Sequence, residues 1–82
     1  MPQQSDTAYL RSIGERVRAL RAERKFTRKR LASTSGVSER YLAQLESGQG
    51  NISVLLLRLV AHALGAGVED LVRESAAATA AR

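Results

Sequence analysis

Gly36 separates two short segments in which apolar residues recur every three or four positions, which is the spacing of one helix face. Thr27 can cap the first segment, and Gly36 suits the left-handed residue that ends it. Ser38 can cap the second segment, whose inner face carries Leu42 and Leu45. The pattern therefore predicts two short helices joined by a tight turn.

The remaining segments are also typical of helices, because β-branched and aromatic residues never alternate over a strand-length window. Apolar spacing predicts a first helix from about Tyr9 to Arg24, and Gly14 within it indicates a close approach by another helix. A fourth helix follows Ser53 and a fifth spans about 68–74. The expected core stripe of the fourth helix is Val54, Leu57, Val60, Ala61 and Leu64. The sequence predicts an all-α, five-helix domain at 9–74, a flexible arm at 1–8 and an alanine-rich tail or linker at 75–82.

Composition argues against several classes of protein. With 82 residues, the chain has room for one small domain. It contains no cysteine and one histidine, His62, without convergent carboxylates, so the sequence predicts no metal, no cofactor and no catalytic group. No stretch approaches the ~18 apolar residues of a membrane span. We therefore expect a soluble, cytoplasmic protein that is not an enzyme and does not bind membranes.

Positive charge is concentrated in one half of the chain. Residues 11–40 contain ten Lys or Arg and three Glu, a net charge of +7, whereas residues 41–82 contain three basic and four acidic residues, a net charge of −1. One-sided positive charge is the pattern of a polyanion binder, although a solvated helix face would look alike. Few aromatic residues are available to stack on single-stranded bases, which favours duplex DNA over RNA.

Two short helices around a Gly-containing turn form a helix-turn-helix, whose second helix enters the major groove of DNA. The motifs LR.ER, T...LA...GVS...L..LE.G and N.S...L...A.ALG, between Ile13 and Val72, resemble the DNA-binding domain of the phage repressor and Cro family, the XRE family. Within that family, residues 35–64 most resemble the N-terminal domain of benzoyl-CoA-responsive repressors of benzoate catabolism. The resemblance implies a lambda repressor-like five-helix fold that binds double-stranded DNA and regulates transcription, as a homodimer on a two-fold operator.

Other uses of the same fold stay open. Antitoxins and adaptor proteins of this fold hold a protein partner, sometimes alongside DNA. The alanine-rich end also resembles the start of a linker, as in a longer repressor with an effector domain, whereas the chain length suits a stand-alone regulator such as a restriction-modification controller protein.

The resemblance assigns base reading to one face of the recognition helix, at about residues 38–47. The base-reading positions are Glu39, Arg40, Ala43 and Gln44. Arg40 can bind guanine O6 and N7, Gln44 can pair with adenine, and Glu39 can accept from cytosine N4. Alternatively, the Glu39 carboxylate orients Arg40 or stabilises the positive N-terminal end of the helix dipole. In another alternative, the face is ordinary solvated surface on which Arg40 and Gln44 form an i,i+4 pair.

A second set of residues is expected to contact DNA phosphates, which position a protein without reading sequence. These residues are Arg28, Lys29, Ser38, Tyr41, Gln49, Gly50 and Asn51. Tyr41 can equally cover the edge of the core with its hydroxyl toward solvent. The resemblance also implies a structural salt bridge between Arg21 and Glu46, which would link the first helix to the end of the recognition helix.

The fourth helix is apolar on both sides, which indicates that it has two partners. Its additional apolar residues, together with one residue in the preceding loop, are Ile52, Leu55, Leu56 and Leu59. We expect this set to form a dimer interface or a surface for another domain, unless neighbouring helices bury all of it.

Overall fold

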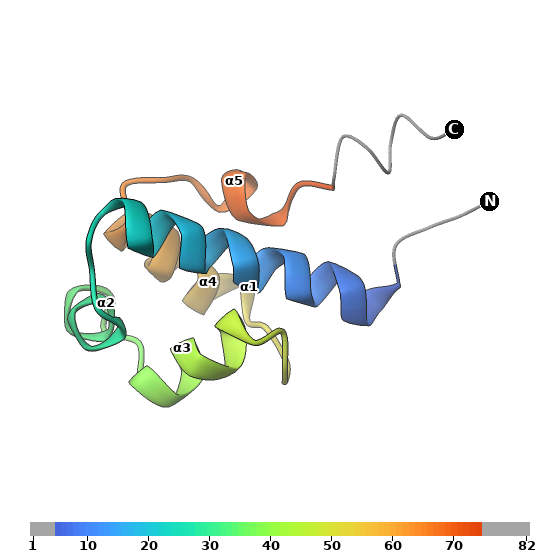
Figure 1. The fold of residues 1–82 in the computed structure, drawn as a ribbon, viewed down its shortest axis with the longest axis horizontal. Helices are drawn as coiled ribbons and strands as arrows, with labels where there is room; N and C mark the ends of the chain where they lie inside the picture. The colour runs from blue at the N-terminus through green and yellow to red at the C-terminus, as the bar shows by residue number, and fades with distance from the viewer. Residues whose placement is uncertain (1–4, 75–82) are drawn as a thin grey trace.

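The computed structural model describes residues 5–74, which form five α-helices (Figure 1). They are α1 Asp6–Glu23, α2 Arg28–Ser35, α3 Glu39–Glu46, α4 Val54–Ala63 and α5 Val68–Val72. The all-α, five-helix prediction is confirmed over this range. None of these helices combines the length and the apolar character that a bilayer crossing requires.

Hydroxyl side chains start four of the five helices. The side-chain oxygens of Ser5, Thr27, Ser38 and Ser53 each accept from the backbone N–H three residues on, at 3.0 to 3.3 Å. Each such cap satisfies a donor that the helix leaves unpaired and contributes about 1 kcal/mol. Gly36 ends α2 with φ +78°, the left-handed conformation that the sequence predicted there.

Two helix boundaries differ from the prediction. α1 begins at Asp6 rather than Tyr9, because Ser5 caps it, so residues 6–8 are helical and not part of an arm. α5 ends at Val72 rather than at residue 74, and Arg73 is extended. Residues 1–4 of the expected arm and the expected tail at 75–82 lie outside the described residues.

One hydrophobic core joins all five helices. Its buried members are Ile13, Val17, Leu31, Val37, Leu42, Leu45, Leu57, Val60, Ala61, Leu64 and Leu71. Val54 was expected in this core, and that prediction is wrong, because 68% of its surface is exposed. Val54 is the first residue of α4, and Ile52 and Leu56 pack against the core at this end of the helix instead.

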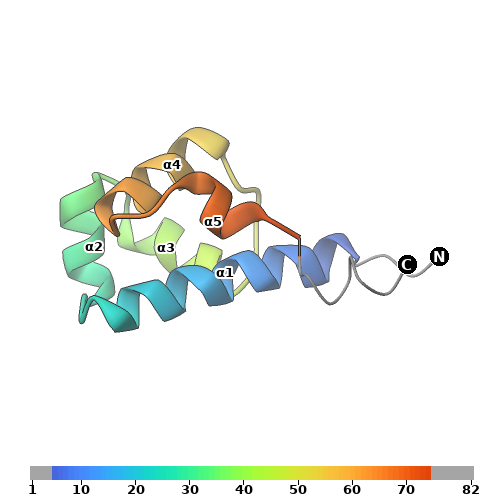
Figure 2. The same cartoon turned by 90° about the horizontal axis from the view of Figure 1, so that it is seen from above.

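α1 is the support on which the other elements are arranged. It packs against α3 and α5, which lie on opposite sides of it in Figure 1, while α2 packs on α3 and α4. Figure 2 shows α4 and α5 together along one side of α1. Gly14 allows the approach of α3, because a Cβ there would lie 2.3 Å from the carbonyl oxygen of Leu45 and 2.7 Å from that of Glu46. The expected close approach at Gly14 is therefore present, and it fixes where α3 lies.

Candidate nucleic-acid interface

α3 presents a polar face to solvent because its opposite face is buried. Leu42 and Leu45 are 0% and 1% exposed and anchor the helix in the core. The predicted base-reading residues occupy the other side of the helix, at i, i+1, i+4 and i+5 spacing. Three of them are exposed and one, Ala43, is half-buried; the exposed ones are Glu39, Arg40 and Gln44. The structure thus brings the four positions onto one face.

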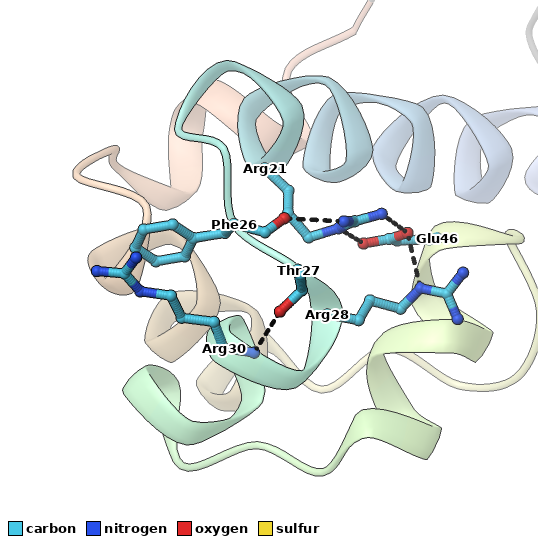
Figure 3. Close-up of polar contacts among 6 residues, drawn as sticks. All are labelled: Arg21, Phe26, Thr27, Arg28, Arg30 and Glu46. Carbon is cyan, nitrogen blue, oxygen red and sulfur yellow. Dashed lines mark hydrogen bonds and ion pairs between the residues drawn. The ribbon is translucent and has the colours of Figure 1, made fainter.

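A partly buried ion pair fixes the end of α3 to α1 (Figure 3). Arg21 donates from Nε to Glu46 Oε2 at 2.7 Å and from Nη2 to Oε1 at 3.0 Å. Nη1 of Arg21 also donates to the carbonyl of Phe26 at 3.0 Å, which ties in the turn between α1 and α2. The hydrogen bond to Glu46 raises the pKa of Arg21, burial opposes this, and attraction to the carboxylate adds to it. Because the Glu46 side chain is 2% exposed and paired, it does not present a free carboxylate to DNA.

Arg28 has a role that the sequence did not predict. Its Nε lies 3.4 Å from Glu46 Oε1, so one carboxylate holds both Arg21 and Arg28 (Figure 3). The Arg28 side chain is still 47% exposed, which leaves part of the guanidinium free for a phosphate. The first residue of α2 is therefore held in place by the end of α3.

The two cations after Arg28 diverge. The Arg30 guanidinium lies 4.5 Å from the centre of the Phe26 ring, a cation–π contact that directs it away from Glu46 (Figure 3). Lys29 is exposed. Arg28 and Lys29, the two predicted phosphate contacts of this cluster, are thus both exposed.

Tyr41 links α3 to the loop that follows it. The Tyr41 ring packs against the edge of the core, and its hydroxyl accepts from the backbone N–H of Ser53 at 3.2 Å. The hydroxyl of Ser38 accepts from the Tyr41 backbone N–H at 3.0 Å. Both hydroxyls keep a hydrogen that can be donated to a phosphate.

The loop before α4 begins beside the polar face of α3. The backbone N–H of Gln49 donates to the carbonyl of Gln44 at 2.9 Å, and Gly50 has φ +76°. Gln49, Gly50 and Asn51 are all exposed. The predicted phosphate-contacting loop is therefore continuous with the base-reading face.

An apolar patch lies on α4. Val54, Leu55 and Leu59 are 68%, 71% and 46% exposed. The alternative that neighbouring helices bury the whole predicted set is therefore excluded, because Leu55 and Leu59 belong to that set. Ile52 and Leu56, the other two predicted members, are half-buried against the core. A hollow of about 300 Å³ runs along the helix between Leu55, Arg58, Leu59 and His62.

A short helix with a polar outer face, pinned at its inner face and preceded by a cationic helix, defines a helix-turn-helix DNA-binding domain. The chain belongs to the HTH_3 family, described as Helix-turn-helix, which matches residues 17–71.

The chain resembles transcription regulators in sequence and structure. It is 41% identical over 63 residues to the immunity repressor protein of Bacillus phage phi105. The matched segment covers 77% of this chain and 44% of that repressor. It is similar to the clp gene regulator ClgR of Corynebacterium glutamicum, with a TM-score of 0.73 and 41% identity over 78% of this chain and 82% of that one. It is also similar to the restriction-modification controller protein C.AhdI of Aeromonas hydrophila, with a TM-score of 0.73 and 32% identity over 76% of this chain and 94% of that one. The chain thus spans less than half the length of the phage repressor it matches.

Proposed function

We propose that this domain binds a specific sequence of double-stranded DNA through α3 and thereby regulates transcription. The observation that carries the proposal is the exposed polar face of α3, which Gly14 and the Arg21–Glu46 pair hold at a fixed position on α1. A rigid support matters because base edges are distinguished by hydrogen bonds of defined geometry. On this face Arg40 suits guanine, Gln44 suits adenine, and Glu39 suits a cytosine N4 donor.

Phosphate contacts around α3 complete the proposed interface. Arg28 and Lys29 stand at the start of α2, whose N-terminus also carries positive partial charge. Backbone N–H groups of Gly50 and Asn51, in the exposed loop that follows α3, offer further donors, and the Ser38 hydroxyl lies at the first turn of α3. Contacts from these groups to phosphates would fix the register of α3 in the major groove while releasing counterions from the DNA.

Selection of bound duplexes from random DNA tests this function. We expect enrichment of one motif built from two inverted half-sites whose centres lie about one helical turn, ~34 Å, apart. Binding should weaken with rising salt while the preferred motif stays the same, since phosphate contacts depend on salt and base contacts specify. Failure to enrich any motif, at a salt concentration where the protein still binds DNA, would contradict sequence-specific recognition.

We also propose that two copies of the chain pair through the apolar patch of α4. Three aliphatic side chains exposed on one small domain are costly in water, and a two-fold pair covers the same patch on both copies. The hollow along α4 between Leu55 and Leu59 can accept aliphatic side chains from the second copy. In such a pair each copy would supply one reading helix to one of the two inverted half-sites expected in the DNA.

Replacement of both Leu55 and Leu59 by Glu should convert the dimer to a monomer, because four unpaired carboxylates would be desolvated in the pair. Sedimentation measures the change, and affinity for the two-fold site should fall much more than affinity for a half-site. Ala22→Glu, which adds a carboxylate to an exposed position of α1, is the control and should leave the dimer intact. An oligomeric state unchanged by the double substitution would exclude this interface.

The narrower kinship with benzoyl-CoA-responsive repressors stays a hypothesis, because it rests on the sequence of residues 35–64 alone. An effector domain or a protein partner on the α4 patch would be the alternative to a second copy. A parent protein that sediments as a monomer with and without the two-fold site would favour that alternative.

A further inference from the structure

A second hollow, of about 410 Å³, lies between α1, the turn after α4 and α5. In Figure 1, α5 and α3 lie on opposite sides of α1, so this hollow is away from the base-reading face. Its volume falls within the range of about 300 to 1,000 Å³ that is typical of small-molecule sites. Arg16, Arg24 and Arg73 line it together with Asp70, and Leu20 and Ala66 contribute apolar surface.

Backbone carbonyls hold two of the three guanidinium groups in place. Arg16 donates from Nη1 to the carbonyls of Leu71, at 2.8 Å, and Arg73, at 2.5 Å. Arg24 donates from Nε to the carbonyl of Leu64 at 3.0 Å. Carbonyls position a guanidinium without neutralising its charge, and each guanidinium has five N–H donors. Arg16 therefore keeps Nε and Nη2 without an acceptor among residues 5–74.

The hollow carries an excess of positive charge. Asp70 is the only acidic residue from 5–74 that lines it, and its Oδ2 accepts from the Gly67 backbone N–H at 3.0 Å, as a cap of α5. Among the described residues, neither Arg16 nor Arg73 has a carboxylate within ion-pair distance, and Arg24 pairs only with Glu23, at an exposed position. Arg16, which two carbonyls hold in place, and Arg73, which has no ion-pair partner among residues 5–74, line the hollow beside apolar side chains and match an anionic group on an apolar body.

We infer that this hollow binds a small organic anion, with its carboxylate or phosphate at Arg16 and Arg73 and its apolar part over Leu20 and Ala66. Asp70 lines the same hollow and disfavours a second anionic group on the ligand. The ligand would bridge α1 and α5 and leave α3 free, so it would stabilise the domain without competing directly for DNA.

NMR titration of the whole chain with phenyl phosphate and, separately, phenylacetate tests the inference. We expect saturable shifts of the amides of Leu20, Gly65 and Ala66, and weaker binding of inorganic phosphate, which lacks the apolar part. The tighter of the two phenyl anions identifies phosphate or carboxylate as the preferred group. Arg73→Gln should weaken binding about tenfold through loss of a charge-assisted hydrogen bond.

Arg18→Gln is the matched control, because Arg18 is exposed on α1, does not line the hollow and loses the same charge. Its effect should stay below about twofold if the site is specific, since removing one remote exposed charge changes little. Equal weakening by the two substitutions, or shifts spread over α2 and α3, would mean non-specific attraction and would overturn the inference. Saturation by an acidic peptide but by neither phenyl anion would also overturn it, in favour of a protein partner. None of these outcomes depends on whether α3 reads DNA.

Discussion

Gly14→Ala should lower the free energy of unfolding by about 2 kcal/mol, although alanine is the better helix former by about 1 kcal/mol. The added methyl would lie 2.3 Å from the Leu45 carbonyl oxygen and 2.9 Å from the carbonyl carbon of Glu46. These atoms belong to the backbone of α3, so no side-chain rotation can relieve the contact. For a domain of this size we expect the melting temperature to fall by roughly 10 °C.

Helix propensity and packing predict opposite signs for this substitution, which makes the thermal melt decisive. Glu15→Ala, at the exposed neighbouring position of α1, is the control and should stay within about 0.5 kcal/mol of the parent. A Gly14→Ala variant that melts higher than the parent would show that α1 and α3 do not approach as closely as the structure has them. If the variant folds, its sequence preference for DNA should also weaken, because α3 is displaced on its support.

The helices could be predicted from the sequence where their signals are local. Thr27, Gly36 and Ser38 act within three residues of their own positions, so the turn between α2 and α3 was readable. The start of α1 was missed because its first turn lacks an apolar stripe. A distant contact helps to fix this end of the helix: the hydroxyl of Tyr9 donates to the carbonyl of Val72.

The candidate interface was also predictable only where its signals are local along the chain. The face shared by Glu39, Arg40 and Gln44 follows from helix periodicity alone. The shared use of Glu46 by Arg21 and Arg28 depends on how α1, α2 and α3 cross, which spacing along the chain does not encode. The Val54 prediction failed similarly, because periodicity assigns a stripe without showing where the neighbouring helices end.

Arg40→Ala and Gln44→Ala should each relax sequence preference, by about 1 to 3 kcal/mol at one base position, while leaving non-specific binding nearly unchanged. Arg28→Ala should instead weaken binding to all sequences and reduce the slope of log affinity against log salt by about 1. Competition between the selected site and single-base variants, repeated over a salt series, separates the two effects. The positions of the two residues explain this difference. Arg40 lies on the exposed face of α3, whereas Arg28 lies at the start of α2, where its guanidinium contacts Glu46.

Arg40→Lys is the sharper test of the Arg40 assignment, because it keeps the charge and removes the planar pair of donors. If Arg40 binds guanine, the Lys variant should retain the salt dependence of the parent and lose much of its preference at one base. If Arg40 merely contacts a phosphate, the Lys variant should behave like the parent throughout. An Arg40→Ala variant that kept the full operator preference would show that Arg40 does not read a base, and Gln44 and Glu39 would then have to carry the recognition.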